Sequence, residues 1–139
     1  MVSAQGDSRA DDTRNTSRPT RVLVVEDEAL IGMDLVMTLE SWGYVADGPH
    51  KNCDQAISAL TSFEPDIGIL DVNLGRDKTS RPIATEMSRL EIPYLFLTGY
   101  SASQTAEDDV LRHAPLLGKP VNHMELRRAL LDLVPDRSD

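Results

Sequence analysis

The sequence has a single cysteine, Cys53, only six aromatic residues among Trp, Tyr and Phe, and no long apolar run. One cysteine excludes a framework of disulfide bonds within the chain, which favours a cytoplasmic protein. No stretch approaches the roughly 20 consecutive apolar residues that a membrane-spanning helix needs. The N-terminus also lacks the apolar segment of a secretion signal. We therefore expect a cytoplasmic protein without a membrane partner.

Basic residues are scarce as well, with 14 Lys and Arg against 23 Asp and Glu, which gives a formal net charge of -9. An acidic surface repels the phosphates of nucleic acids and of anionic lipids. The composition therefore predicts no nucleic-acid partner and favours other proteins, or a metal ion, as partners.

The 139 residues are a one-domain length. Residues 1–19 contain too few apolar side chains to offset the entropy of ordering them, so we expect a disordered N-terminal tail. Residues 20–135 are expected to form one domain, and 136–139 a short C-terminal tail. We expect no attached output domain.

From residue 21 onwards, short β-branched and apolar runs alternate with longer helical patterns. The patterns predict strands over 21–25, 44–48, 66–70, 93–97 and 115–118, and helices over 28–41, 52–62, 81–90 and 122–134. Such alternation predicts an α/β fold, with a parallel sheet that carries helices on both faces.

Two of the helical patterns are unusual. The apolar residues of the first helix, including Leu30, Met33 and Met37, form one broad stripe, and we expect Met33 and Met37 to lie in the core. The segment 102–112 has a stripe of small side chains only, which would bury little area against the sheet. We expect an irregular or mobile helix there.

Polar residues follow the predicted strands at the end where such sheets bind their ligands. They are Glu26 and Asp27 after the first strand, Asp71 after the third, Thr98 after the fourth and Lys119 after the fifth. Carboxylates brought together repel one another unless a cation joins them, and oxygen ligands suit Mg²⁺. The pattern therefore predicts a Mg²⁺ site.

Beside such a cation, Lys119 and Thr98 would face the oxygens of a phosphoryl group. Asp71 could then attack the phosphorus as a nucleophile and form an acyl phosphate. The added negative charge would draw Thr98 and the loop after it inward.

Four motifs in this order resemble the receiver domains of two-component response regulators. The resemblance covers about residues 20–135, and its motifs are "EDE" with Glu26 and Asp27, "LDVNLG" around Asp71, "LTG" with Thr98, and "GKP" with Lys119 and Pro120. It implies a flavodoxin-like, doubly wound fold whose five parallel strands have the order 2-1-3-4-5.

The resemblance also assigns roles. It implies that Asp71 is the phosphoacceptor, that Asp27, Asp71 and the main-chain oxygen of Asn73 hold Mg²⁺, and that Glu26 acts through a water molecule. It implies a cis peptide bond before Pro120.

The sequence departs from the family pattern at the switch. Typical receivers have an aromatic residue three positions before the lysine, where this chain has Leu116. The stretch "FLTGYS" resembles a subgroup of small stand-alone receivers marked by Phe-Ala-Thr-Gly, a hydrophobic residue and Tyr, although Leu97 replaces the alanine and Tyr100 comes one place early. This likeness implies that Tyr100 takes over part of the aromatic's role alongside Thr98.

A purely structural role and two different functions compete with this hypothesis. Each acid, taken alone, could be a first-turn or turn-forming residue. A phosphatase of the haloacid dehalogenase type also uses a strand-end aspartate with Mg²⁺, but it needs a second acid where this chain has Asn73. A flavin or nucleotide binder needs an anion cradle where this chain has "EDEALIG".

The motifs together favour a single-domain response regulator that is phosphorylated by a sensor histidine kinase. It would bind a downstream target, relay the phosphoryl group to a histidine phosphotransfer protein, or drain it from the kinase. We expect it to catalyse only its own phosphorylation and dephosphorylation.

Overall fold

The computed structural model describes residues 18–75, 78–99 and 114–134. Its strands are β1 (Arg21–Val25), β2 (Val45–His50), β3 (Ile67–Asp71), β4 (Tyr94–Thr98) and β5 (Leu116–Gly118). Its helices are α1 (Ala29–Ser41), α2 (Cys53–Ser62), α3 (Arg81–Arg89) and α5 (His123–Leu133). Most of the two predicted tails, and the helix predicted over 102–112, lie outside the described residues.

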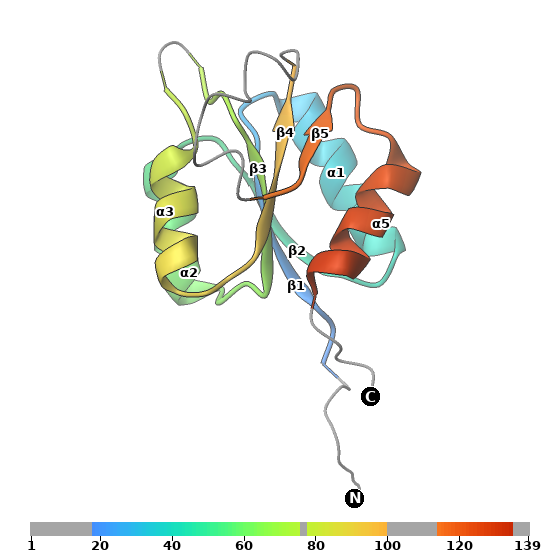
Figure 1. Ribbon diagram of the computed structural model, residues 1–139, viewed down its shortest axis with the longest axis horizontal. Helices are drawn as coiled ribbons and strands as arrows, with labels where there is room; N and C mark the ends of the chain where they lie inside the picture. The colour runs from blue at the N-terminus through green and yellow to red at the C-terminus, as the bar shows by residue number, and fades with distance from the viewer. Residues whose placement is uncertain (1–17, 76–77, 100–113, 135–139) are drawn as a thin grey trace, which may run out of the picture.

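The strands form one parallel sheet in the order β2-β1-β3-β4-β5. Helices α2 and α3 cover one face of the sheet, and α1 and α5 cover the other (Figure 1). This arrangement confirms the predicted flavodoxin-like fold. Every predicted strand and helix within the described residues is found with ends no more than two residues away from the prediction.

Consecutive side chains of the central strands pack into different layers of the core. Val22 and Val24 of β1 join the cluster beneath α1 and α5, whereas Leu23 and Val25 join the cluster beneath α2 and α3. All four are fully buried. A strand covered on both faces needs an unbroken apolar run, which explains the sequence of β1.

Helix α1 does not bury the whole apolar stripe that its sequence suggests. Leu30, Met33 and Met37 are 82%, 53% and 66% exposed, so the prediction that Met33 and Met37 belong to the core was wrong. The buried face instead consists of Gly32, Leu35 and Leu39. Apolar residues surround this helix on several sides, so their spacing did not identify the packed face.

Gly32 of α1 lies against Pro49 of β2. A Cβ atom added to Gly32 would lie 2.5 Å from the Cβ of Pro49, which is too short for two carbon atoms. The missing side chain therefore allows the helix to pack directly on the proline ring.

Local signals fix the helix ends. Asn52 and Asn122 precede α2 and α5, and their side chains accept hydrogen bonds from the main-chain nitrogens of Gln55 and Glu125 at 2.9 and 3.0 Å. Gly43 follows the end of α1 with a φ of 94°, a conformation that glycine adopts without strain.

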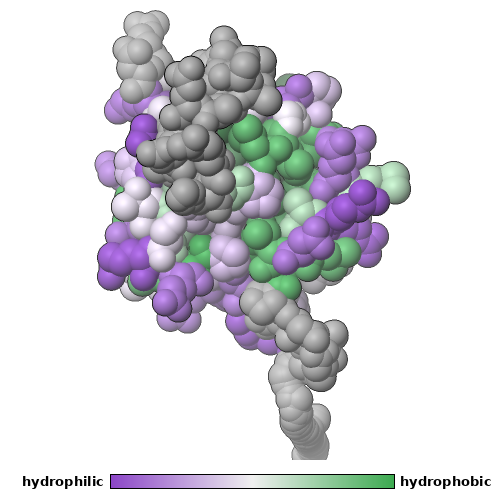
Figure 2. All heavy atoms as spheres, viewed as in Figure 1, coloured by the Kyte–Doolittle hydropathy of each residue, from purple (hydrophilic) through white to green (hydrophobic). Residues whose placement is uncertain are grey.

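The surface carries apolar side chains as well as many charged ones. On the face shown in Figure 2, apolar residues gather mainly over β5 and α5, next to strongly hydrophilic side chains. Among the described residues, no helix has the length and apolar character needed to cross a membrane.

Candidate functional site

The carboxyl ends of the parallel strands bring the predicted residues to one edge of the sheet. Asp71 is the last residue of β3 and pairs in register with Leu97, the neighbour of Thr98 at the end of β4. Thr98 in turn pairs with Gly118, directly before Lys119. Glu26 follows β1, which pairs with β3 on its other side.

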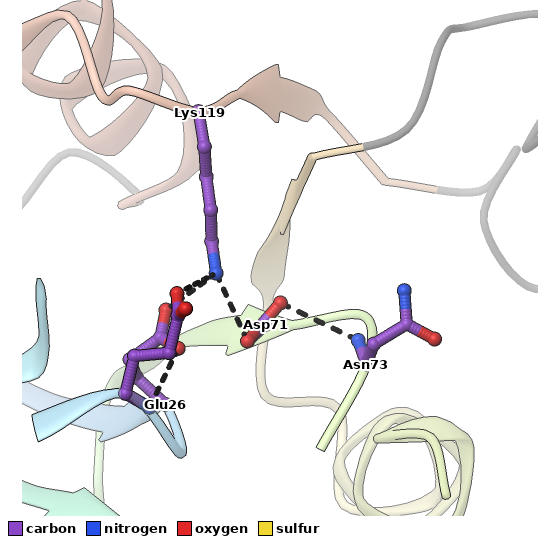
Figure 3. Close-up of polar contacts among 5 residues, drawn as sticks. Glu26, Asp71, Asn73 and Lys119 are labelled. Atoms are coloured by element: carbon purple, nitrogen blue, oxygen red, sulfur yellow. Dashed lines mark hydrogen bonds and ion pairs between the residues drawn. The ribbon is translucent and has the colours of Figure 1, made fainter. Parts of the chain in front are cut away.

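Lys119 connects these strand ends through its ammonium group. Its Nζ lies 3.0 Å from Oδ2 of Asp71 and 2.9 Å from Oε1 of Glu26 (Figure 3). Glu26 is fully buried and Asp71 is only 3% exposed. The cation that follows β5 therefore faces two buried carboxyl groups, one directly after β1 and one at the end of β3.

Three carboxyl groups, including that of Asp71, form a cluster at the end of β3. Glu26, Asp27 and Asp71 each offer an oxygen, and these oxygens lie within 4.8 Å of one another. Burial and the adjacent Glu26 raise the pKa of Asp71 to about 8, against the opposing effect of Lys119. At neutral pH the carboxyl of Asp71 therefore holds a proton for much of the time, unless a further cation is present.

The loop after β3 folds back as a short hairpin. Asn73 forms an antiparallel bridge with Thr79, and the main-chain nitrogens of Leu74 and Ser80 donate to the carbonyls of Lys78 and Val72. Among the described residues, no hydrogen bond is recorded to the carbonyl of Asn73 itself. This oxygen therefore remains available as a ligand.

The side chain of Asn73 lies further from the site than its main chain does. Its amide group points away from Asp71 and Lys119 (Figure 3), while its main-chain nitrogen donates to Oδ1 of Asp71 at 3.4 Å. The backbone of Asn73 thus faces the site, and the side chain does not.

Lys119 and Thr98 are joined through their main chains. The nitrogen of Lys119 donates to the carbonyl of Thr98 at 2.9 Å, and the peptide bond between Lys119 and Pro120 is cis. Burial acts to lower the pKa of the Lys119 ammonium, but its contacts with Glu26 and Asp71 outweigh this effect and raise the pKa above its ordinary value. The lysine therefore remains positively charged.

The residues predicted to form the switch are not all placed at this edge. Leu116 lies in β5, is partly buried and packs against the core cluster beneath α2 and α3. Tyr100 lies outside the described residues. Thr98 is 3% exposed at the end of β4. The switch roles of these three residues remain predictions.

The sequence analysis did not foresee a contact made by Glu28. The position of Glu28 in the sequence indicates only an acid near the start of a helix. Its Oε1 lies 3.5 Å from Nζ of Lys119. The signal was present in the sequence, because Glu28 is the third of three consecutive acids directly after β1.

The chain is similar in sequence and in fold to known proteins. No protein-family model matches the chain. The transcriptional regulatory protein PdtaR of Mycobacterium tuberculosis is 36% identical over 90 residues, which are 64% of this chain and 43% of PdtaR. The chain therefore spans less than half the length of this relative.

Solved structures match over a larger share. SdrG of Pseudomonas melonis Fr1, in its BeF3-activated conformation, is 34% identical with a TM-score of 0.72, and the match covers 85% of this chain and 98% of SdrG. The signal receiver domain of a modulated diguanylate cyclase from Desulfovibrio desulfuricans G20 is 27% identical with a TM-score of 0.74, covering 86% of this chain and 97% of that domain. With these likenesses in sequence and fold, the chain belongs to the receiver domain family of two-component response regulators.

Proposed function

We propose that the protein is a single-domain response regulator in which Asp71 accepts a phosphoryl group from a histidine kinase in a Mg²⁺-dependent reaction. The observation that carries this proposal is the distance of 3.0 Å between Nζ of Lys119 and the nearly buried carboxyl of Asp71. Buried acids whose pKa is shifted by burial and by a specific charged partner cluster at functional sites. The BeF3-activated form of SdrG adds support, because BeF3 resembles a phosphoryl group bound to a carboxylate.

The donor atoms fit a small hard cation. Carboxylate oxygens of Asp27 and Asp71 and the carbonyl of Asn73 would hold Mg²⁺, with Glu26 acting through a water molecule. When bound, Mg²⁺ would supply the positive charge that keeps the carboxyl groups ionised and neutralises phosphoryl oxygens.

The chain's own residues would then carry out the transfer. An oxygen of the ionised Asp71 attacks the phosphorus, an O–P bond forms, and the P–N bond to the histidine ring breaks, leaving the electron pair on the ring nitrogen. Lys119 neutralises a phosphoryl oxygen, and the hydroxyl of Thr98 donates a hydrogen bond to another. Tyr100 would take over part of the signalling role of the aromatic residue that Leu116 replaces, alongside Thr98.

A donor protein would have to approach the carboxyl edge of the sheet, because Asp71 is almost buried. Helix α1 begins beside this edge. Its exposed side chains Leu30, Met33 and Met37 offer apolar contact area. The phosphorylated protein would bind a target, relay the group to a histidine phosphotransfer protein, or drain the kinase. Its single cysteine supports a cytoplasmic setting.

The phosphatase alternative is less well supported. It needs a second acid two positions after the nucleophile to protonate a leaving group. Asn73 occupies that position, and its amide points away from Asp71 (Figure 3). We therefore propose no turnover of an external phosphate ester.

The experiment that tests the proposal compares the wild-type protein with Asp71→Asn. Each is incubated with Mg²⁺ and acetyl phosphate, and intact mass is measured; Mg²⁺ with BeF3 is followed by NMR. We expect the mass of one phosphoryl group and BeF3-induced shifts in the wild type only. Phosphorylation that persists in Asp71→Asn would refute the assigned acceptor, and its absence from the wild type would refute the proposed function.

A further inference from the structure

A further carboxylate lies at the entrance of the site. Oε1 of Glu28 is 3.5 Å from Nζ of Lys119, and the Glu28 side chain is 62% exposed, in contrast to the buried side chains of Glu26 and Asp71. Glu28 is therefore the acid of this group that an approaching molecule meets first.

The side chain of Glu28 is not used for local helix structure. Glu28 occupies the N-cap position of α1, yet its side chain makes no capping hydrogen bond. Among the described residues, its carboxylate contacts the ammonium of Lys119. The carboxylate is thus directed toward the site instead of the first turn of α1.

The negative charge of Glu28 is in excess of what the cations of the site would balance. The three clustered carboxylates of Glu26, Asp27 and Asp71 would be balanced by one divalent cation together with Lys119. Glu28 does not belong to that cluster. With Glu28 included, the site carries one more negative charge than one divalent cation and Lys119 together can balance, although Glu28 shares the ammonium of Lys119.

We propose that Glu28 determines donor specificity by repelling small anionic phosphoryl donors from the entrance. This inference rests on the proposed function and adds the class of donor that the site disfavours. A free acyl phosphate approaches as a dianion, whereas a donor protein can bring its own positive groups to offset Glu28. In a solvated entrance, the repulsion of one carboxylate is worth about three- to tenfold in rate for a dianion.

The test measures the phosphorylation rate of the wild type, Glu28→Gln, Glu28→Asp and Glu40→Gln with two small donors, followed by intact mass. Acetyl phosphate is a dianion near neutral pH, and phosphoramidate is a monoanion. Glu40 is the matched control, because it is an exposed acid on the same helix, about 18 Å further along its axis. Both reactions form the same O–P bond on Asp71, releasing acetate or ammonia.

We expect Glu28→Gln to react about three- to tenfold faster with acetyl phosphate and to gain less with phosphoramidate. Glu28→Asp and Glu40→Gln should stay near the wild-type rates. Raising the salt from about 0.05 to about 0.5 M should shrink the gain, because salt screens charges at an exposed entrance. A Mg²⁺ titration followed by NMR should show that Glu28→Gln still binds the ion.

Three results would overturn the inference in different ways. If the wild type is phosphorylated and Glu28→Gln shows the same rates at both salt concentrations, the role of Glu28 is refuted while the proposed function stands. If neither donor phosphorylates the wild type, the proposed function fails and the inference fails with it. An equal gain for both donors would also contradict repulsion by charge.

Discussion

Nζ of Lys119 lies 3.0 Å from Oδ2 of Asp71, although β4 separates their strands in the sheet. Neighbouring strands are about 4.8 Å apart, so the backbones of β3 and β5 are separated by roughly twice that distance. Only a long side chain can bridge such a gap. Both the length and the charge of Lys119 are therefore expected to matter.

Replacing Lys119 with methionine keeps most of the length and removes the charge. We expect phosphorylation by acetyl phosphate to slow by about a hundredfold or more, because a preorganised positive charge no longer stabilises the transferring group. Mg²⁺ should still bind, since the proposed ligands remain. Lys119→Arg, which keeps the charge, should lose less activity, and equal losses in both variants would contradict an electrostatic role.

The affinity for Mg²⁺ should rise with pH between about 6 and 8. In the metal-free protein the pKa of Asp71 is raised from 3.8 to about 8, so Asp71 is largely protonated below that value, and the cation must displace the proton. One displaced proton changes the affinity by at most about tenfold per pH unit. Isothermal titrations in buffers of different ionisation enthalpy would count the released protons, and a pH-independent affinity without proton release would contradict this prediction.

Gly32→Ala should lower the free energy of unfolding by about 1–3 kcal/mol. The added methyl group would meet the ring of Pro49 at about 2.5 Å, and α1 would have to move away from β2. Chemical denaturation measures the change. Glu40→Ala, an exposed substitution on the same helix, is the control, and an undiminished stability of Gly32→Ala would show that the helix yields without cost.

Cys53 should react slowly with thiol reagents in the folded protein. Burial and the nearby Asp54 raise the pKa of the thiol, and its Sγ donates to the carbonyl of Thr79 at 3.3 Å. Because the thiolate is the reactive form, a raised pKa lowers the reactive fraction at pH 8, and the rate should continue to climb above pH 9. Alkylation rates compared with those of a free cysteine peptide test this; an equal rate at pH 8 would contradict it.

The sequence was a good guide to the fold because its strands and helices carry strong local signals. The apolar run of β1 and the asparagine caps of α2 and α5 act over a few residues, and strand alternation with helices leaves few topologies. The exposed face of α1 was not foreseen, since it depends on the approach of Gly32 to Pro49, two residues far apart in the sequence.

The candidate site was predictable for a similar reason. Parallel strands end at one edge, so Glu26, Asp71 and Lys119 could be expected to meet without knowledge of any distance. The direction of the Glu28 side chain could not be predicted, because an acid after a strand can equally cap a helix. The hairpin between Asn73 and Thr79 was also missed, since it depends on how the loop folds back on itself.

The acids of the site and its lysine are carried by different kinds of strand. Glu26 and Asp71 adjoin interior strands that have neighbours on both sides, whereas Lys119 follows β5, a strand of three residues at the margin of the sheet. The two acids are thus held by strands with hydrogen-bonded neighbours on both sides, and the ammonium is held by its ion pairs with those acids. A change in the charge on Asp71 therefore acts directly on a lysine that a three-residue strand at the edge of the sheet carries into the site.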